Sequence, residues 1–379
     1  MSISKVFLLF SFVFLFIGFK WNDGDLLCVF FLILSPVMAS VVSLFRGNTS
    51  LHFSRNEVFI LFILVFISIL HQLFVLSVND KNDLLRSFYV AAQWWICIGV
   101  FFLMSFIKAD EKDFKFISGI IVFFLIFNVI YQIITGVGFV HATNIYSSLI
   151  MLVTLFSCSV NIRRNIMCFW IFFLGLVCIY LMGARFSLLG LILGFVIIQI
   201  SLNGLIKLLK SLFWIVFIIS NSFVVGIVYI YNNGIGFVLN QVVFDYTGKQ
   251  LFSGREKMWG DFIEAILSSP FYGYGFSAQA SMFSDVDYST HNLLLAIGIQ
   301  QGVVGVLLFV MIIMTINIMS LSKFIDKGHD YILYPAVIIP VVLFQQSFEL
   351  SLTQNNVSYM VTFWMLLGLT FFSKVNKTK

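Results

Sequence analysis

The chain has 379 residues, of which 60% are apolar and only 10% are charged, and its mean hydropathy is +1.03. Soluble domains carry about 25% charged residues, so these values exclude a soluble globular protein and predict an all-α polytopic membrane protein. We interpret the small net charge of +5 as a result of basic residues that set the orientation of the chain in the membrane. We therefore expect no nucleic-acid partner. All five cysteines fall within apolar runs, which provides neither a disulfide framework nor a Cys/His metal site. We expect no metal and no other cofactor.

Runs without charged residues mark the predicted membrane spans, because a spanning helix needs about 20 apolar residues. The run Phe116–Ile162 is broken by Thr-Gly-Val-Gly at 135–138 and is counted as two helices, which gives about twelve spans in all. The runs are Val6–Phe19, Leu26–Phe45, Val58–Asn79, Ser87–Ile107, Phe116–Ile162, Asn165–Ala184, Phe186–Ile206, Ser211–Phe244, Tyr288–Ser322, Tyr331–Phe348 and Leu350–Ser373. No soluble domain is evident, so residues 1–379 are predicted to form a single membrane domain.

The positions of lysine and arginine predict the orientation, since these residues are more frequent in cytoplasmic segments. With both termini inside, cytoplasmic segments hold 15 of these residues and outer segments hold 7. The longest connection, residues 232–291, then forms one large outer loop.

This loop contains a predicted amphipathic helix. Ser253 and Glu256 form a capping-box pattern, and Ser-Pro at 269–270 ends the helix. We expect the helix to lie at the membrane interface as a cover over the bundle. Arg255 stands in its first turn, where free backbone N–H groups favour an anion site, although a solvated surface arginine is the simpler interpretation of Arg255 alone. The apolar stripe is formed by Met258, Trp259, Phe262, Ile263, Ile266 and Leu267.

Arg185 stands between two apolar runs with almost no loop between them. A charge at such a place is by default a hypothesis of function. The alternative is an arginine that reaches to outer lipid phosphates. Arg86, which follows the polar stretch 79–83, is a weaker candidate for the same work, and there the lipid alternative is favoured.

His291 opens the run that follows the loop, and an imidazole at the membrane boundary can act as a general base. A histidine bonded at a helix N-terminus is the ordinary alternative. Among the four other histidines only His141, in a short outer loop, is a serious rival. Glu349, beside Gln345 and Gln346, either orients His291, binds hydroxyl groups of a substrate or caps the next helix; the sequence leaves these alternatives open.

Two arginine motifs carry a resemblance to the O-antigen ligase and polymerase superfamily. The segment G-A-R-F-S-L-L-G resembles the Ser-Arg-Gly element of that superfamily, and Arg185-x3-Leu189 fits its R-x3-L motif. The segment S-G-R-E-K-M-W, which contains Arg255, is similar to the arginine element of its large periplasmic loop. Ala184 stands where serine is frequent, and the loop is rather short, but neither departure touches an arginine position.

A histidine motif and an asparagine motif extend the resemblance. His291-x10-Gly302 fits the H-x10-G motif, including Asn292 after the histidine, and Asn144 is similar to an asparagine that opens a span after a glycine-containing loop. Each motif alone is weak, but their order, spacing and common predicted side make the match fairly specific. The resemblance covers roughly 136–306.

The resemblance implies a membrane glycosyltransferase that moves a glycan from undecaprenyl diphosphate to a hydroxyl group at the periplasmic face, without metal or nucleotide sugar. His291, Arg185 and Arg255 are then the catalytic candidates, because a base must accept the hydroxyl proton and bidentate cations must bear the diphosphate charge. Attack opposite the diphosphate would invert the anomeric centre. The resemblance alone suggests a chain-length regulator and a flippase as partners. Substrate-binding candidates are Arg86, Asn144, Trp259, Asn292 and Glu349.

Within the superfamily the composition favours a polymerase, because the chain is rich in Phe, Ile, Asn and Lys, as polysaccharide clusters with AT-rich DNA tend to encode. A ligase that transfers polymer to the lipid A core is the main alternative. A flippase or transporter would carry charges within its spans and related halves, which the sequence lacks. A metal-dependent glycosyltransferase has only the pairs Asp23 with Asp25 and Asp80 with Asp83 in its support. A purely structural scaffold does not need two arginines and a histidine on one face.

Overall fold

The structure is a computed structural model that describes residues 34, 37–41, 55–79, 83–107, 109–135, 143–202, 206–247, 255–284, 290–327, 330–350, 352 and 356–373. Every regular element in this part of the chain is a helix, as the sequence predicts. Among these described residues, six helices are long and apolar enough to cross a membrane, and four more apolar helices are shorter. The protein is therefore an all-α polytopic membrane protein. The predicted span Val6–Phe19 and most of Leu26–Phe45 lie outside the described residues, so the count of twelve stays a prediction.

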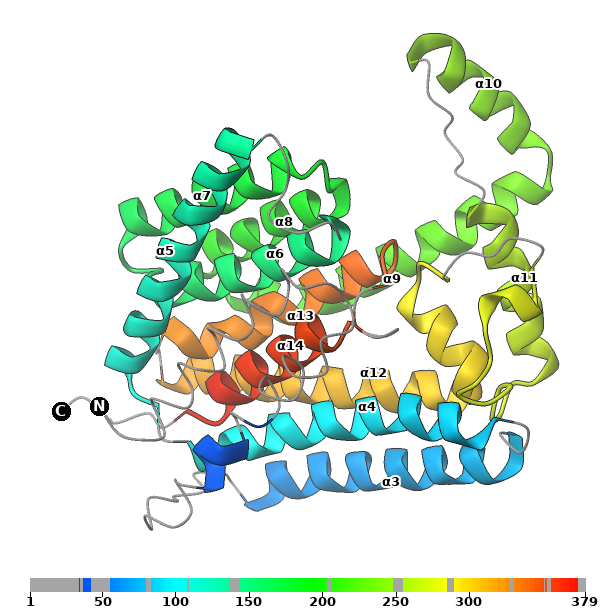
Figure 1. Ribbon diagram of the computed structural model, residues 1–379, viewed down its shortest axis with the longest axis horizontal. Helices are drawn as coiled ribbons and strands as arrows, with labels where there is room; N and C mark the ends of the chain where they lie inside the picture. Colours follow the sequence, from blue (N-terminus) through cyan, green and yellow to red (C-terminus); the bar gives the residue numbers. More distant parts are fainter. Residues whose placement is uncertain are drawn as a thin grey trace.

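The described helices follow the charge-free runs closely (Figure 1). The break expected near residue 136 separates α5 from α6, which confirms that the long run holds two helices. The α-helices are α3 (Arg55–Asn79), α4 (Leu84–Leu103), α5 (Glu111–Thr135), α6 (Thr143–Val160), α7 (Asn165–Leu181), α8 (Arg185–Leu202), α9 (Ile206–Asn232), α10 (Ile235–Thr247), α11 (Arg255–Ser268), α12 (Leu293–Lys327), α13 (Leu333–Gln346) and α14 (Val357–Phe371).

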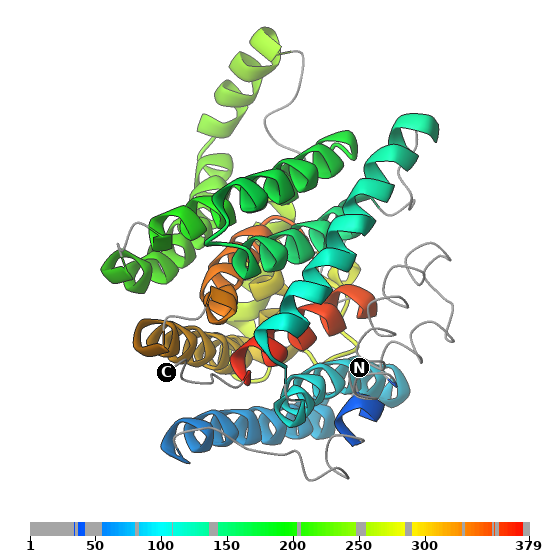
Figure 2. The same ribbon diagram turned by 90° about the vertical axis from the view of Figure 1, so that its left-hand side faces the viewer.

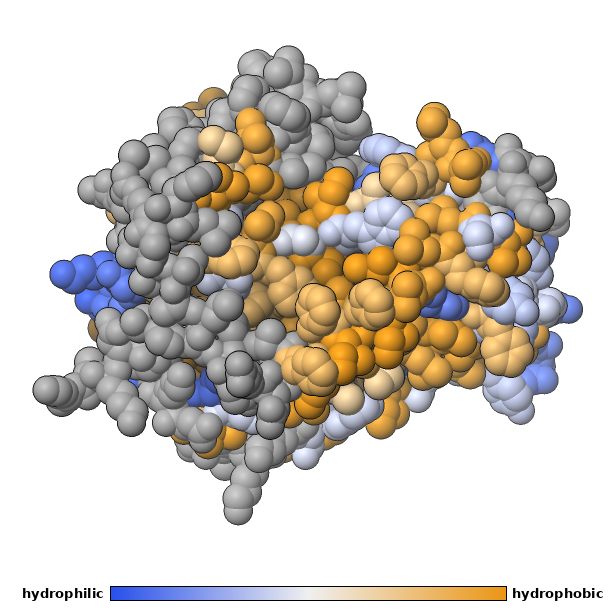
Figure 3. All heavy atoms as spheres, turned by 90° about the horizontal axis from the view of Figure 1, so that it is seen from below, coloured by the Kyte–Doolittle hydropathy of each residue, from blue (hydrophilic) through white to orange (hydrophobic). Residues whose placement is uncertain are grey.

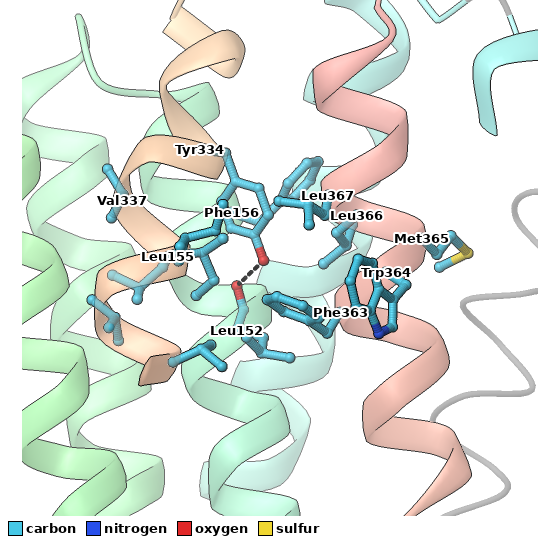
Figure 4. Packing of buried hydrophobic residues seen from close by; sticks show 14 of the residues in the cluster. Leu152, Leu155, Phe156, Tyr334, Val337, Phe363, Trp364, Met365, Leu366 and Leu367 are labelled. Carbon is cyan, nitrogen blue, oxygen red and sulfur yellow. Dashed lines mark hydrogen bonds between the residues drawn. The ribbon is translucent and has the colours of Figure 1, made fainter. Parts of the chain in front are cut away.

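Helices α6 and α13 form the centre of the bundle. Residues 146–160 of α6 and 333–343 of α13 are all buried, and the serines and the threonine of this part of α6 are buried with its apolar residues. The Tyr334 hydroxyl of α13 donates to the Leu152 carbonyl of α6 at 3.5 Å, and residues of α14 pack beside this contact (Figure 4). The outer helices surround this core and thereby fix the positions of its ends.

One face of the bundle is apolar where α3 lies. Figure 3 shows this face, with hydrophobic side chains across its middle and hydrophilic ones towards the end where α11 lies. A helix that exposes so many large apolar residues suits contact with lipid. Exposed residues of α3 include Phe59, Ile60, Phe62, Phe66, Leu73 and Phe74.

The charge-free run Ser211–Phe244 holds one candidate span, Ser211–Asn232, and its remainder forms a separate helix. The structure divides the run into α9 and α10 at Asn233 and Gly234, and Gly234 has a φ of +73°. Glycine takes this left-handed conformation without steric cost, so the chain turns there although the hydropathy continues. As a result α10 projects away from the bundle (Figures 1 and 2).

Helix α12 is broken at Gly302, which has φ +69° and ψ −175°. The turn that follows α11 occupies the break: the Val303 N–H donates to the Pro270 carbonyl at 2.7 Å, and the Tyr274 N–H donates to the Ile299 carbonyl at 2.7 Å. A Cβ atom at residue 302 would lie 2.6 Å from the Pro270 carbonyl oxygen. The glycine is thus needed both for its backbone conformation and for this close approach.

Candidate active site

His291 lies in the short link before α12 and is held by its two neighbours. Its φ is +48°, a left-handed conformation that is uncommon for any residue other than glycine. Asn292 caps α12, since its Oδ1 accepts from the Leu295 N–H at 2.9 Å, and its Nδ2 donates to the Ser347 carbonyl at 3.1 Å. The Thr290 hydroxyl donates to the Asn292 carbonyl at 3.2 Å. Thr290 and Asn292 are buried, whereas the ring of His291 remains partly exposed.

The Glu349 carboxylate faces the His291 ring. Its Oε2 atom lies 3.8 Å from His291 Nδ1, an ion-pair distance when the imidazole is protonated and longer than a hydrogen bond. The side chains are 26% and 15% exposed, so both groups can meet a ligand. Among the roles that the sequence left open for Glu349, this geometry favours the orientation of His291. A carboxylate at Nδ1 also leaves Nε2 to accept a proton.

Trp259 of α11 supports the residue before His291. Its indole Nε1 donates to the Thr290 carbonyl at 3.0 Å, and its side chain is 3% exposed. Helix α11 buries most of its predicted stripe against α9 and α12, but Leu267 is exposed. Because the polar atoms of Trp259 and Asn292 are bonded within the protein, both residues position His291 here, and their contact with a substrate stays a prediction.

The two arginines that the sequence suggests as catalytic candidates begin helices at this end of the bundle. Arg185 is the first residue of α8 and is exposed. The next ring, Phe186, stacks on Phe348 at 4.7 Å between centroids, so Arg185 and Glu349 flank one stacked pair. Arg255 is the first residue of α11, one turn before Trp259, and its side chain lies outside the described residues.

Arg86 contacts the loop at another point. In the amide orientation that satisfies both groups, the Gln279 side-chain oxygen accepts from the Arg86 guanidinium, 3.0 Å from Nη2. Nearby, Asn79 at the end of α3 donates to the Gly273 carbonyl at 3.0 Å. These contacts fasten the segment after α11 to α3 and α4. Substrate binding by Arg86 stays a prediction.

Asn144 lies in the first turn of α6 and is exposed. Its carbonyl accepts from the hydroxyls of Ser147 and Ser148 at 2.7 and 2.8 Å. The rival histidine, His141, lies outside the described residues. Within the part of the chain that the structure describes, no three His, Cys, Asp or Glu side chains gather in a way that could hold a metal ion.

This arrangement defines an all-α membrane protein with a cluster of a histidine, a carboxylate and an arginine-bearing helix start at one end of its bundle. Residues 170–310 match a family model described as O-antigen ligase. The match is consistent with the superfamily that the motifs predicted, and the matched residues include Arg185, Arg255 and His291. No curated protein matches the chain.

Sequence reasoning missed the residues that hold the site together. Thr290, Ser347 and Gln345 carry no motif, and each acts through a backbone or buried contact that depends on the tertiary fold. The only available signal was the position of Gln345 and Ser347 directly before Glu349 in the chain.

Proposed function

We propose that the protein is an O-antigen polymerase. It transfers the growing glycan from undecaprenyl diphosphate to a hydroxyl of another lipid-linked repeat unit, at the periplasmic face of the inner membrane. The observation that carries this proposal is the His291–Glu349 pair, which lies at the end of the bundle where α8 begins with Arg185 and α11 begins with Arg255.

In the proposed reaction the acceptor hydroxyl gives its proton to His291 Nε2 as its oxygen attacks the anomeric carbon. A new glycosidic bond forms on the face opposite the leaving group, and the bond between the anomeric carbon and the diphosphate oxygen breaks. Undecaprenyl diphosphate leaves with the electron pair. Because attack occurs on the opposite face, the anomeric centre is inverted. The proton then passes from His291 to solvent.

Negative charge develops on the diphosphate oxygen as this bond breaks, and a guanidinium fork can donate two hydrogen bonds to it. Arg185 and Arg255 suit this task because both start helices, where free backbone N–H groups also favour an anion. Glu349 stabilises the imidazolium that forms on His291, since the two groups are within ion-pair distance.

The orientation of the chain supports the periplasmic location of this site. With 15 basic residues in the predicted cytoplasmic segments and 7 outside, the loop 232–291 faces the periplasm, where assembled lipid-linked units are available. A chain-length regulator and a flippase are proposed partners, because the length of the polymer must be limited and the lipid-linked substrate must be delivered to the periplasmic side.

A ligase that transfers polymer to the lipid A core is the second candidate, favoured by the description of the matching family model. The glycan phenotype of a deletion strain separates the two. A polymerase mutant retains lipid core with a single repeat unit attached. A ligase mutant has no attached repeats and accumulates polymer on the lipid carrier.

A further inference from the structure

Gln345 is fully buried at the C-terminal end of α13, and its side-chain amide is bonded on all sides. Its Nε2 donates to the hydroxyl of Ser148 and, at 3.0 Å, to that of Ser187. Its Oε1 accepts from the Tyr359 hydroxyl at 3.2 Å and lies 3.5 Å from the Gln346 amide nitrogen. One side chain therefore joins α6, α8, α13 and α14.

Two of the joined helices carry a residue of the candidate site, and Glu349 follows the end of a third, α13. Ser148 in turn donates to the carbonyl of Asn144 on α6. Ser187 follows Arg185 by two residues on α8, and its hydroxyl lies 3.0 Å from that of Ser147. The backbone N–H of Glu349 donates to the Gln345 carbonyl at 2.9 Å. The arginine and the carboxylate are thus tied to the same glutamine by short paths.

The chemistry of this position selects an amide. A buried polar group costs free energy unless it is hydrogen-bonded. The residues around Gln345 offer two acceptors to one end of its side chain and two donors to the other end. This matches the two N–H groups and the carbonyl lone pairs of a glutamine side chain. A fully satisfied buried network fixes one arrangement of the helices that share it.

We propose that Gln345 is a positioning residue that sets α8 and α13 relative to each other, so that Arg185 and Glu349 address the same diphosphate-linked sugar. This inference rests on the proposed function for its effect on glycosyl transfer, but its structural content stands apart from it. Gln345 acts through the two helices and, being fully buried, does not touch the substrate.

The first test replaces Gln345 by methionine, which keeps the length and apolar volume but removes the hydrogen bonds. The matched control is Gln132→Met in α5, because Gln132 is also buried but its amide atoms have no hydrogen-bond partner in the described part of the chain. We expect Gln345→Met to lower kcat about 10- to 10²-fold with little change in KM, as displacement of reacting groups by about 1 Å can do. Gln132→Met should leave both constants unchanged.

The second test measures helix position without any enzyme assay. The substitutions Phe186→Cys and Phe348→Cys place one thiol on α8 and one just after the end of α13, at the stacked pair. A short bifunctional thiol reagent is then added to membranes. We expect rapid crosslinking in the otherwise unchanged chain and with Gln132→Met, and slow crosslinking with Gln345→Met. If Gln345→Met fails to insert, Ser187→Ala removes one bond of the same network and serves in its place.

The outcomes separate the two proposals. Wild-type kcat and crosslinking in both Gln345→Met and Ser187→Ala would overturn the positioning role. Slow crosslinking in a protein whose unsubstituted form transfers no glycan from undecaprenyl diphosphate would support the positioning role and refute the proposed function.

Discussion

His291 and Glu349 face each other across the start of α12 and the end of α13, with Nδ1 and Oε2 3.8 Å apart. A neighbouring bond fixes this approach, because Asn292 Nδ2 donates to the Ser347 carbonyl at 3.1 Å. The histidine of the H-x10-G motif thus acquires a carboxylate partner from a segment 58 residues further along the chain.

Substitution of Glu349 by glutamine tests this pairing. The amide keeps the shape but removes the negative charge that stabilises the imidazolium, so we expect kcat to fall about 10- to 10²-fold, less than for loss of the base itself. Transfer rates of purified protein measure the effect. Glu264→Gln, an exposed carboxylate on α11, is the matched control and should be neutral. Equal rates for the two variants would remove Glu349 from the mechanism.

The diphosphate role of the arginines predicts a specific failure of lysine. Lysine keeps the charge but lacks the planar fork, so Arg185→Lys and Arg255→Lys should each lose about 10²- to 10³-fold in kcat while inserting normally. Arg164→Lys, in the exposed turn between α6 and α7, should have no effect. Full transfer activity in either of the first two variants would return that arginine to a surface or lipid-facing role.

The break in α12 predicts a local stability effect. Gly302→Ala adds a Cβ atom that would meet the Pro270 carbonyl and forces alanine into a left-handed backbone. We expect a loss of about 1–3 kcal/mol in the free energy of unfolding, seen as a lower Tm in detergent. Gly99→Ala in α4 is the control, because a Cβ there meets nothing within 4 Å. Identical melting of both variants would show that the break is not tightly packed.

The helices were largely predictable, since charge-free runs and the glycine pattern near residue 136 are local signals. The breaks at Gly234 and Gly302 were not, because both lie inside long charge-free runs and hydropathy alone does not register a left-handed glycine. The helical stripe of α11 was visible through a different local signal, because Met258, Trp259 and Phe262 recur with the period of a helix.

The chemistry of the candidate site was predictable as residue types, but its support was not. Motif spacing indicated His291 and Arg185, whereas the contacts of Trp259 with Thr290 and of Gln345 with Ser187 join segments far apart in the chain. Such contacts depend on how helices pack, and single residues of common types leave no pattern in the sequence. The sequence therefore suggested Trp259 and Asn292 as ligand-binding candidates, although their polar atoms are bonded inside the protein.

The orientation predicts the side on which each segment lies. A reporter fused at Lys257 should be periplasmic and one at Lys379 cytoplasmic, because the 15 to 7 distribution of basic residues places both termini inside. Enzymatic reporters that are active on only one side of the membrane measure this directly. Both reporters on one side would refute the predicted topology and with it the periplasmic site.

The most direct test of the account is glycan transfer by His291→Ala. Loss of a general base costs about 10² to 10⁴ in rate, so a deletion strain that carries this variant should form no polymer ladder, while the purified variant still binds the lipid-linked donor. His141→Ala, the other histidine predicted near the same surface, should give a mild effect. A normal ladder from His291→Ala, together with its loss in His141→Ala, would contradict the assignment of His291 as the base.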